Sequence, residues 1–207
     1  MYRLYWGART GAFAPQVMLA ELGLSCELVH IDLAAGEHQD PAYLAVNPAG
    51  RVPALVLPDG TVMGESAAMV LLLGERHPEG RHVPGPADPE RARFLHWLLY
   101  MATSIYPALN HMAHAERGTT DPGGVEAVRA AARGVMDERF ARLDEAIAGD
   151  PWFLPDGYGA LDIYAAMLAD WHPDRDALLE RNPALARLCR AAEERDVFAR
   201  VMAQHRG

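Results

Sequence analysis

The stretch 47–69 holds the residues best suited to bind a small ligand. Its first four residues, 47–50 (Asn-Pro-Ala-Gly), predict a turn, because Pro fixes φ and Gly tolerates positive φ. Pro53 then precedes a short apolar strand and a hairpin, after which Glu65 and Ser66 open an apolar run that predicts a helix. A Val-Pro peptide beside a strand and two polar side chains at a helix N-terminus together offer groups that can hold a small peptide.

This stretch resembles the glutathione-binding half of the glutathione S-transferases, in which Asn-Pro-x-Gly-x-Val-Pro-x-Leu is followed by a hairpin and then by Glu-Ser-x-Ala. The resemblance implies that the bond between Val52 and Pro53 is cis. It also implies that the Val52 backbone pairs with the cysteinyl amide of glutathione, and that Glu65 and Ser66 bind its γ-glutamyl carboxylate and amine. Glutathione would then be a co-substrate, and no metal would be needed.

The family ionises the glutathione thiol, and two hydroxyl groups compete for the role of thiol activator. Tyr5 falls where tyrosine-type members keep their catalytic hydroxyl, and Thr10 falls just ahead of a predicted helix, near the position used by serine- and threonine-type members. Gly11 occupies the position at which the bacterial beta class carries a catalytic Cys. We favour Thr10 over Tyr5, because its donor would act together with the helix dipole.

The glycyl carboxylate of glutathione needs cations or amide donors. Arg51 replaces the Gln that often precedes Val-Pro in the family, and its guanidinium has the geometry to bind a carboxylate through two parallel bonds. His38 lies in the loop where other members place Lys or His. Tyr106, on a long predicted helix, is our candidate for a pocket that takes a small apolar electrophile, expected between the two domains.

Composition excludes several classes of function. The 207 residues carry a formal net charge of -9, which argues against a groove for nucleic acid and against an anionic membrane surface. The N-terminus shows no secretory signal, no run of about 18 apolar residues could span a membrane, and two Cys residues do not make a disulfide framework. We therefore expect a cytoplasmic protein.

Periodicity predicts an α/β thioredoxin-like N-terminal domain over residues 1–77, a linker over 78–89, and an all-α helical bundle over 90–207. The first domain should run β-α-β-α-β-β-α. In the second domain, helices are predicted over 91–115, 125–147, 160–171 and 183–203, the last interrupted near Asp196. Gly159 and Asp162 resemble the family's capping box at the start of the third of these helices, with Gly in place of the usual hydroxyl residue.

The sequence therefore favours a homodimeric glutathione S-transferase that adds glutathione to a small apolar electrophile. A glutathione-dependent peroxidase or disulfide reductase is the alternative within the same chemistry. A non-catalytic glutathione-binding protein of the same fold also remains open, because Gly11 replaces a thiol and Leu99 stands where some beta-class members contribute a polar contact from the partner subunit.

Overall fold

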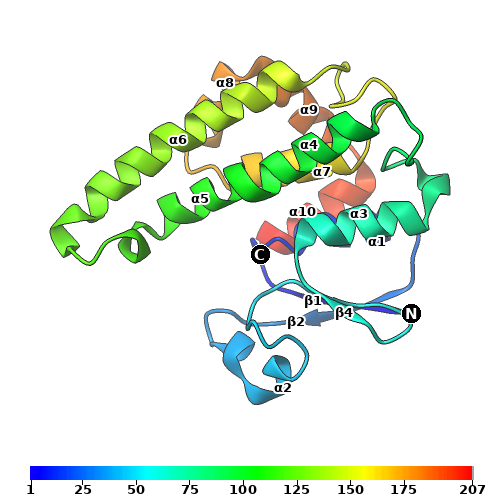
Figure 1. The fold of residues 1–207 in the computed structure, drawn as a ribbon, viewed down its shortest axis with the longest axis horizontal. Helices are drawn as coiled ribbons and strands as arrows, with labels where there is room; N and C mark the ends of the chain where they lie inside the picture. The colour runs from blue at the N-terminus through cyan, green and yellow to red at the C-terminus, as the bar shows by residue number, and fades with distance from the viewer. Residues whose placement is uncertain (207) are drawn as a thin grey trace. The chain divides into compact units, whose positions relative to one another are not determined.

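The computed structural model describes residues 1–206, and packing divides them into two compact units (Figure 1). The first unit combines residues 1–85 with the C-terminal segment that begins at Glu193, and the second spans Pro86–Ala192. The predicted domains are continuous in sequence, whereas the two units are defined by packing. The main difference is that the last helix packs with the N-terminal unit, although the prediction assigned it to the C-terminal domain.

The first unit has the predicted thioredoxin-like order of elements, which is thereby confirmed. Its strands and helices are β1 (Tyr2–Trp6), α1 (Phe13–Glu21), β2 (Cys26–His30), α2 (Pro41–Leu44), β3 (Ala54–Val56), β4 (Val62–Met63), α3 (Ser66–Arg76) and α10 (Asp196–Arg206). Short 3-10 turns lie at Glu37–Gln39 and Pro78–Gly80. Figure 1 shows α1 and α3 on one side of the sheet and α2 on the other.

The strands form one mixed sheet in the order β2-β1-β3-β4. β1 runs parallel to β2 and antiparallel to β3, with Tyr5 opposite both Val29 and Ala54. β3 runs antiparallel to β4, with Leu55 opposite Met63. This register brings the end of β1, the start of β3 and the end of β4 to the same edge of the sheet, which we call the β1 exit edge. Its residues are 7–12, 51–53 and 64–66.

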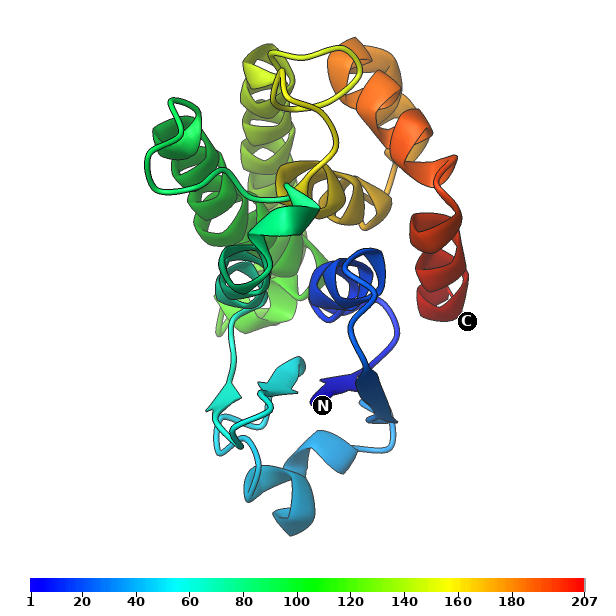
Figure 2. The same ribbon diagram turned by 90° about the vertical axis from the view of Figure 1, so that its right-hand side faces the viewer.

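The helix α10 packs on α1 through a buried polar group as well as through apolar contacts (Figure 2). The Gln16 side chain, 4% exposed, donates from Nε2 to Gln204 Oε1 at 2.6 Å and accepts at Oε1 from His205 Nε2 at 2.9 Å. The Phe13 and Phe198 rings meet edge to face at 5.0 Å. The apolar periodicity of 196–206 predicts a helix but does not reveal which element covers it, which is why sequence order placed it with the second domain.

The second unit is helical, as predicted. It contains α4 (Arg91–Tyr100), a π turn (Met101–Ile105), α5 (Tyr106–Ala113), α6 (Val125–Ala146), α7 (Ala160–Asp170), α8 (Arg175–Arg181) and α9 (Pro183–Glu193), with 3-10 turns at Ala115–Gly118 and Pro122–Gly124. The sequence prediction missed α8, which has only seven residues. The predicted break near Asp196 is confirmed, because α9 ends at Glu193 and α10 begins at Asp196.

The π turn interrupts the helix that was predicted as continuous over 91–115. Pro107 has no amide hydrogen, so the carbonyl four residues earlier cannot receive its usual helical bond. The guanidinium of Arg139 on α6 donates to the Ser104 carbonyl within the turn. The turn therefore has a local cause in Pro107 and a partner on the neighbouring helix.

The helix α7 is buried along most of its length, and Asp162 anchors its start. The two oxygens of this carboxylate, which is 1% exposed, accept the backbone N–H groups of Phe153 and Gly159, each at 2.7 Å. Gly159 lacks a side chain, so only the acidic half of the capping box is made. The predicted role of Asp162 at this helix start is confirmed.

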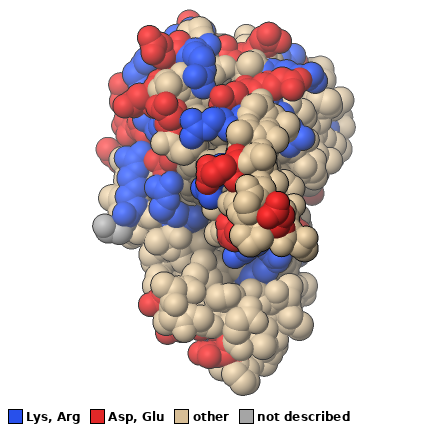
Figure 3. Space-filling model, turned by 90° about the vertical axis from the view of Figure 1, so that its left-hand side faces the viewer, with Lys and Arg blue, Asp and Glu red and all other residues tan. Residues whose placement is uncertain are grey.

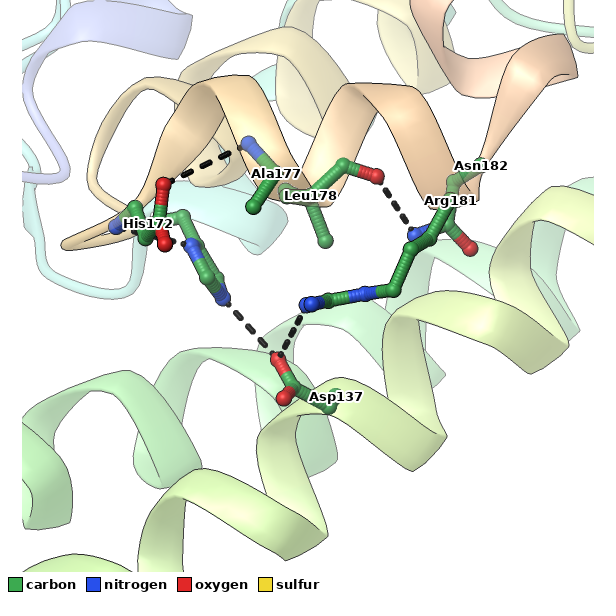
Figure 4. Close-up of polar contacts among 7 residues, drawn as sticks. Asp137, His172, Ala177, Leu178, Arg181 and Asn182 are labelled. Carbon is green, nitrogen blue, oxygen red and sulfur yellow. Dashed lines mark hydrogen bonds and ion pairs between the residues drawn. The ribbon is translucent and has the colours of Figure 1, made fainter.

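A His-Asp pair in the second unit serves structure rather than chemistry (Figure 4). His172 Nε2 lies 3.1 Å from Asp137 Oδ1, while its Nδ1 accepts the backbone N–H of Asp174 at 3.1 Å. Arg181 also contacts Asp137 Oδ1 at 3.3 Å. Both ring nitrogens of this buried His are used, so neither is free to move a proton to or from a substrate.

On the face drawn in Figure 3, Arg side chains are mixed with Asp and Glu, and no continuous basic stripe crosses it. Within residues 1–206, no helix is long and apolar enough to cross a membrane.

Candidate functional site

Three chain segments that the sequence marks as functional meet at the β1 exit edge. The loop 7–12 joins β1 to α1, residues 51–53 lead into β3, and residues 64–66 join β4 to α3. Both α1 and α3 therefore begin at this edge, and they pack against each other. A helix N-terminus carries partial positive charge and unpaired N–H groups, so two of them at one edge favour anionic ligand groups.

The backbone ahead of β3 is held by two side-chain donors on the Arg51 carbonyl. The Tyr43 hydroxyl donates to it at 2.5 Å, and Asn47 Nδ2 donates at 2.7 Å. Gly50 turns the chain with φ +58°, and a Cβ there would come within 2.7 Å of Gln39 Nε2. The positive φ therefore favours glycine at this position, whereas the flexible Gln39 side chain could move aside from a Cβ.

Val52 follows this clamped carbonyl and precedes β3. Its peptide bond to Pro53 is cis, as the resemblance implies. Its side chain packs against the buried cluster of Ile31, Tyr43 and Ala54. Within residues 1–206, neither backbone polar group of Val52 hydrogen-bonds to another residue. Because backbone N–H and C=O groups are strong donors and acceptors, this residue presents an open strand edge to a ligand.

Glu65 and Ser66 form the start of α3. Glu65 is exposed and has φ 62° and ψ 98°, a conformation that residues with a side chain rarely adopt. Its carbonyl accepts the Met69 N–H at 3.0 Å, which begins the helix, and Ser66 is buried at the first helical position. Backbone strain of this kind costs about 1–3 kcal/mol and concentrates at functional sites, so it singles out Glu65 independently of the sequence motif.

The Thr10 hydroxyl organises the loop ahead of α1. It donates to the Gly7 carbonyl at 2.8 Å and accepts the Ala12 N–H at 3.3 Å, and the residue is 8% exposed. Its single proton is therefore directed to a backbone acceptor. The hydroxyl would have to rotate away from Gly7 before it could donate to a bound sulfur.

The Tyr5 side chain lies in different surroundings from those of Thr10. The Tyr5 ring lies edge to face with Tyr43 at 5.5 Å, packed against the cluster that contains Val52. Its hydroxyl lies near Arg3, whose pKa is raised first by Glu27, which bonds its guanidinium at 2.7 Å, and then by Tyr5.

The two candidate carboxylate ligands flank the turn 47–50. Arg51 is exposed and makes no ion pair with another residue among 1–206. His38 lies in the 3-10 turn packed on Gly50, with its carbonyl 3.2 Å from the place of a Cβ there, and its buried Nδ1 has no hydrogen-bond partner. Both side chains therefore retain capacity to bind an anion.

Tyr106 belongs to the second unit, where it begins α5 directly after the π turn. It is half-buried, and its ring lies perpendicular to that of Trp171 with the centroids 5.1 Å apart. Trp171 was not predicted to be a functional residue. The sequence shows only that it is an aromatic residue at the end of a predicted helix, and such residues more often belong to a core.

Neither thiol of the chain substitutes for the missing Cys at position 11. Burial raises the pKa of Cys26 to about 11, so its thiol stays protonated at neutral pH, and Cys189 is buried. Within residues 1–206, no group of three or more His, Cys, Asp or Glu side chains could hold a metal ion.

Comparison with known proteins gives a consistent result. A family model described as the N-terminal domain of glutathione S-transferase matches residues 14–82. The glutathione S-transferase GstA of Escherichia coli O157:H7 is 25% identical over 170 residues, 82% of this chain and 81% of its own. A maleylacetoacetate isomerase of Pseudomonas aeruginosa is 30% identical over 166 residues, 75% of this chain and 73% of its own. A glutathione transferase homologue from Sulfitobacter, solved with bound glutathione, has a TM-score of 0.87 and 25% identity, covering 99% of this chain and 98% of that one.

Proposed function

The chain belongs to the glutathione S-transferase family, and we propose that it binds glutathione at the β1 exit edge and transfers the sulfur to a small apolar electrophile. One observation carries the assignment to this edge: the backbone N–H and C=O of Val52 are unpaired beside a clamped turn. An extended tripeptide that pairs with them would add a short strand next to β3. The cysteinyl residue is the one that this pairing would hold.

The ends of glutathione would be bound by groups on either side of Val52. Glu65 and Ser66 would bind the charged γ-glutamyl end at the start of α3, where the helix dipole favours the carboxylate. Arg51 and His38 would bind the glycyl carboxylate, supported by the unused polar groups of both side chains.

We propose that Thr10 and the N-terminus of α1 stabilise the glutathione thiolate. A free thiol has a pKa of about 8.5, and lowering it by two units requires roughly 2.7 kcal/mol of differential stabilisation. A hydrogen bond to a charged acceptor contributes about 1.5–3 kcal/mol. The Thr10 hydroxyl would turn from Gly7 to the sulfur, and the thiol proton would leave to solvent. Tyr5 remains the second candidate.

The thiolate would attack an electrophilic carbon, form the new C–S bond and displace the leaving group with its electron pair. Tyr106, with its ring against Trp171, would contact the apolar part of the electrophile. We further propose that the protein works in the cytoplasm.

Two measurements test this function together. Calorimetry with reduced glutathione should detect binding at or below millimolar concentration, and a chromogenic aryl halide should be conjugated faster than without protein. Absence of heat at millimolar glutathione would remove the ligand assignment. Binding without conjugation would instead favour a non-catalytic glutathione-binding protein of the same fold.

Replacing Glu65 by Ala should weaken glutathione binding about tenfold, with a smaller effect on turnover at saturating glutathione. The loss of a charge-assisted contact of about 1.5 kcal/mol corresponds to that factor. Calorimetry measures the change in Kd. Glu145→Ala, on the exposed surface of α6, is the matched control and should bind glutathione like the parent. A Kd unaltered by Glu65→Ala would exclude the carboxylate from the binding site.

We also propose that the protein is a homodimer, as the family resemblance suggests. Leu99, which stands where some beta-class members contribute a contact from the partner subunit, lies on α4 and is 56% exposed, so it is accessible to a second subunit. Light scattering should return a mass of twice 22.6 kDa. A monomeric mass at micromolar protein concentration would contradict the proposal.

A further inference from the structure

The tetrapeptide Leu-Pro-Asp-Gly occurs twice in the chain, at 57–60 and at 154–157. The first copy forms the hairpin turn between β3 and β4, and the second lies in the loop that leads into α7. In each copy the Gly N–H donates to the carbonyl of the Leu, which is the hydrogen bond of a β-turn with Pro at its second position. The two turns therefore share their sequence and backbone pattern, so a difference in their chemistry must come from the residues around them.

An Asp-Gly peptide can rearrange without any added reagent. The Gly nitrogen attacks Cγ of the Asp carboxyl group, the new C–N bond closes a five-membered succinimide ring, and the carboxyl hydroxyl leaves with the amide proton as water. A second water molecule then opens the ring at the original backbone carbonyl, and the chain afterwards runs through the Asp side chain as isoaspartate. The reaction needs a protonated carboxyl group and an unrestrained Gly N–H, and Gly assists it because no Cβ obstructs its nitrogen.

Asp59 is held in a form that resists this reaction. Its Oδ1 accepts the Thr61 N–H at 2.9 Å, and its Oδ2 lies 3.9 Å from the Arg76 guanidinium. The Thr61 bond first, and Arg76 after it, hold the pKa of the Asp59 carboxyl below its usual value, so its reactive protonated form is rare at neutral pH. The Gly60 N–H is also occupied, because it donates to the Leu57 carbonyl at 2.9 Å.

Asp156 lacks these restraints. It is exposed and forms no hydrogen bond or ion pair with another residue among 1–206. The Gly157 nitrogen lies 3.3 Å from the Leu154 carbonyl oxygen, just outside the range of about 2.7–3.2 Å of ordinary N–H···O bonds. Both the carboxyl group and the nitrogen that would attack it are therefore held less firmly than those of Asp59 and Gly60.

Asn side chains undergo the same ring closure, but the three Asn residues of the chain are poorly placed for it. Asn47 and Asn182 precede Pro, whose nitrogen carries no proton and cannot close the ring. Asn110 lies inside α5, where the backbone N–H groups are engaged in helical hydrogen bonds. Isoaspartate in this protein should therefore arise from the two Asp-Gly peptides.

We propose that Asp156 is a modification site at which the chain isomerises spontaneously to isoaspartate, whereas Asp59, in the same tetrapeptide, is protected by its hydrogen bonds. The change would act on the start of α7, because the Asp162 carboxylate binds the N–H groups of Phe153 and Gly159, which lie on either side of Asp156. Isoaspartate adds one carbon to the backbone between these two groups, so they can no longer reach the carboxylate in the same geometry. Ageing at this one residue would thus loosen the anchor of a buried helix.

Peptide mapping of aged protein tests the proposal. The full-length protein is kept at neutral pH and physiological temperature and then cleaved after Arg at mildly acidic pH, which places Asp59 in fragment 52–76 and Asp156 in fragment 143–175. Isoaspartate in each fragment is quantified by liquid chromatography with mass spectrometry and by methyl transfer from an L-isoaspartyl methyltransferase. It should accumulate about tenfold faster in 143–175 than in 52–76, the factor that one or two lost hydrogen bonds would give.

The same measurement in concentrated guanidinium chloride separates the effect of the fold from that of the sequence. The unfolded chain keeps both Leu-Pro-Asp-Gly segments but loses the bonds that restrain Asp59. The two fragments should therefore gain isoaspartate at equal rates.

Two matched variants link the modification to stability. Asp156→Glu keeps the charge but would have to close a larger ring, so fragment 143–175 should stay free of the modification. Asp59→Glu is the control and should age like the parent. The isoaspartate-containing fraction of the parent and of Asp59→Glu should unfold at a temperature about 2–4 °C lower than fresh protein, whereas aged Asp156→Glu should keep its Tm.

Four results would overturn the proposal or one of its parts. Equal rates at the two sites in the native protein, or a faster rate at Asp59, would remove the protection by hydrogen bonds. Unequal rates in guanidinium chloride would assign the difference to sequence rather than to the fold. Isoaspartate at position 156 with an unchanged Tm would remove the effect on α7. None of these results depends on whether the protein binds or conjugates glutathione.

Discussion

Replacing Thr10 by Ala should lower kcat/KM for glutathione conjugation about 10- to 1000-fold, because the thiolate loses a directed donor. The pH at which the rate levels off should rise by as much as about two units, because the thiol pKa returns toward its free value. A pH profile of kcat/KM with a chromogenic aryl halide measures both effects. Glutathione affinity should change much less than turnover.

Two further variants separate this chemistry from the structural role of the same hydroxyl. Thr10→Ser keeps the donor and the bond to Gly7, so it should recover most of the activity. Tyr5→Phe keeps the ring against Tyr43 and removes only a hydroxyl that lies near Arg3, so its activity should stay close to that of the parent. An active Thr10→Ala protein together with an inactive Tyr5→Phe protein would reverse the assignment.

Asp162→Ala should cost about 3–5 kcal/mol of unfolding free energy. The substitution leaves the buried N–H groups of Phe153 and Gly159 without an acceptor, at about 1–3 kcal/mol each, and removes the anchor of α7. Domains are stable by only about 5–15 kcal/mol, so the variant should be close to unfolding at physiological temperature. Urea unfolding followed by circular dichroism measures the change.

The control for this prediction is another Asp in the first turn of a helix. Asp176 in α8 is exposed, so Asp176→Ala should change the unfolding free energy by less than about 1 kcal/mol. If Asp162→Ala lost no more than this control, the two 2.7 Å bonds would not be what holds the start of α7.

The elements of the first unit could be predicted because their signals are local. Alternation marks β1, Gly23 ends α1 with a φ of +63°, and the Pro and Gly residues of 47–60 separate the strands. The register follows from this order, because a right-handed β-α-β unit and a closing hairpin leave few alternatives. These features bring residues 51–53 and 64–66 to one edge without further information.

The surroundings of the Tyr5 and Thr10 hydroxyl groups could not be predicted from local signals. Their spacing from Gly23 places both near the end of β1, but the hydroxyl directions depend on which side chains surround them. The Tyr5 ring packs against Tyr43, a residue 38 positions away in the chain, and its hydroxyl lies near Arg3. The donor pair on the Arg51 carbonyl was missed for the same reason, since Tyr43 carries no motif of its own.

The attachment of α10 to α1 has a consequence for biosynthesis. Gln16 is translated well before its two hydrogen-bonding partners, Gln204 and His205, which follow it by 188 and 189 residues. Until they arrive, the amide must remain hydrated, because enclosing it without partners is costly. The N-terminal unit therefore completes its core only after residues 204 and 205 have been made, and the second unit, Pro86–Ala192, is made in full before the first can close.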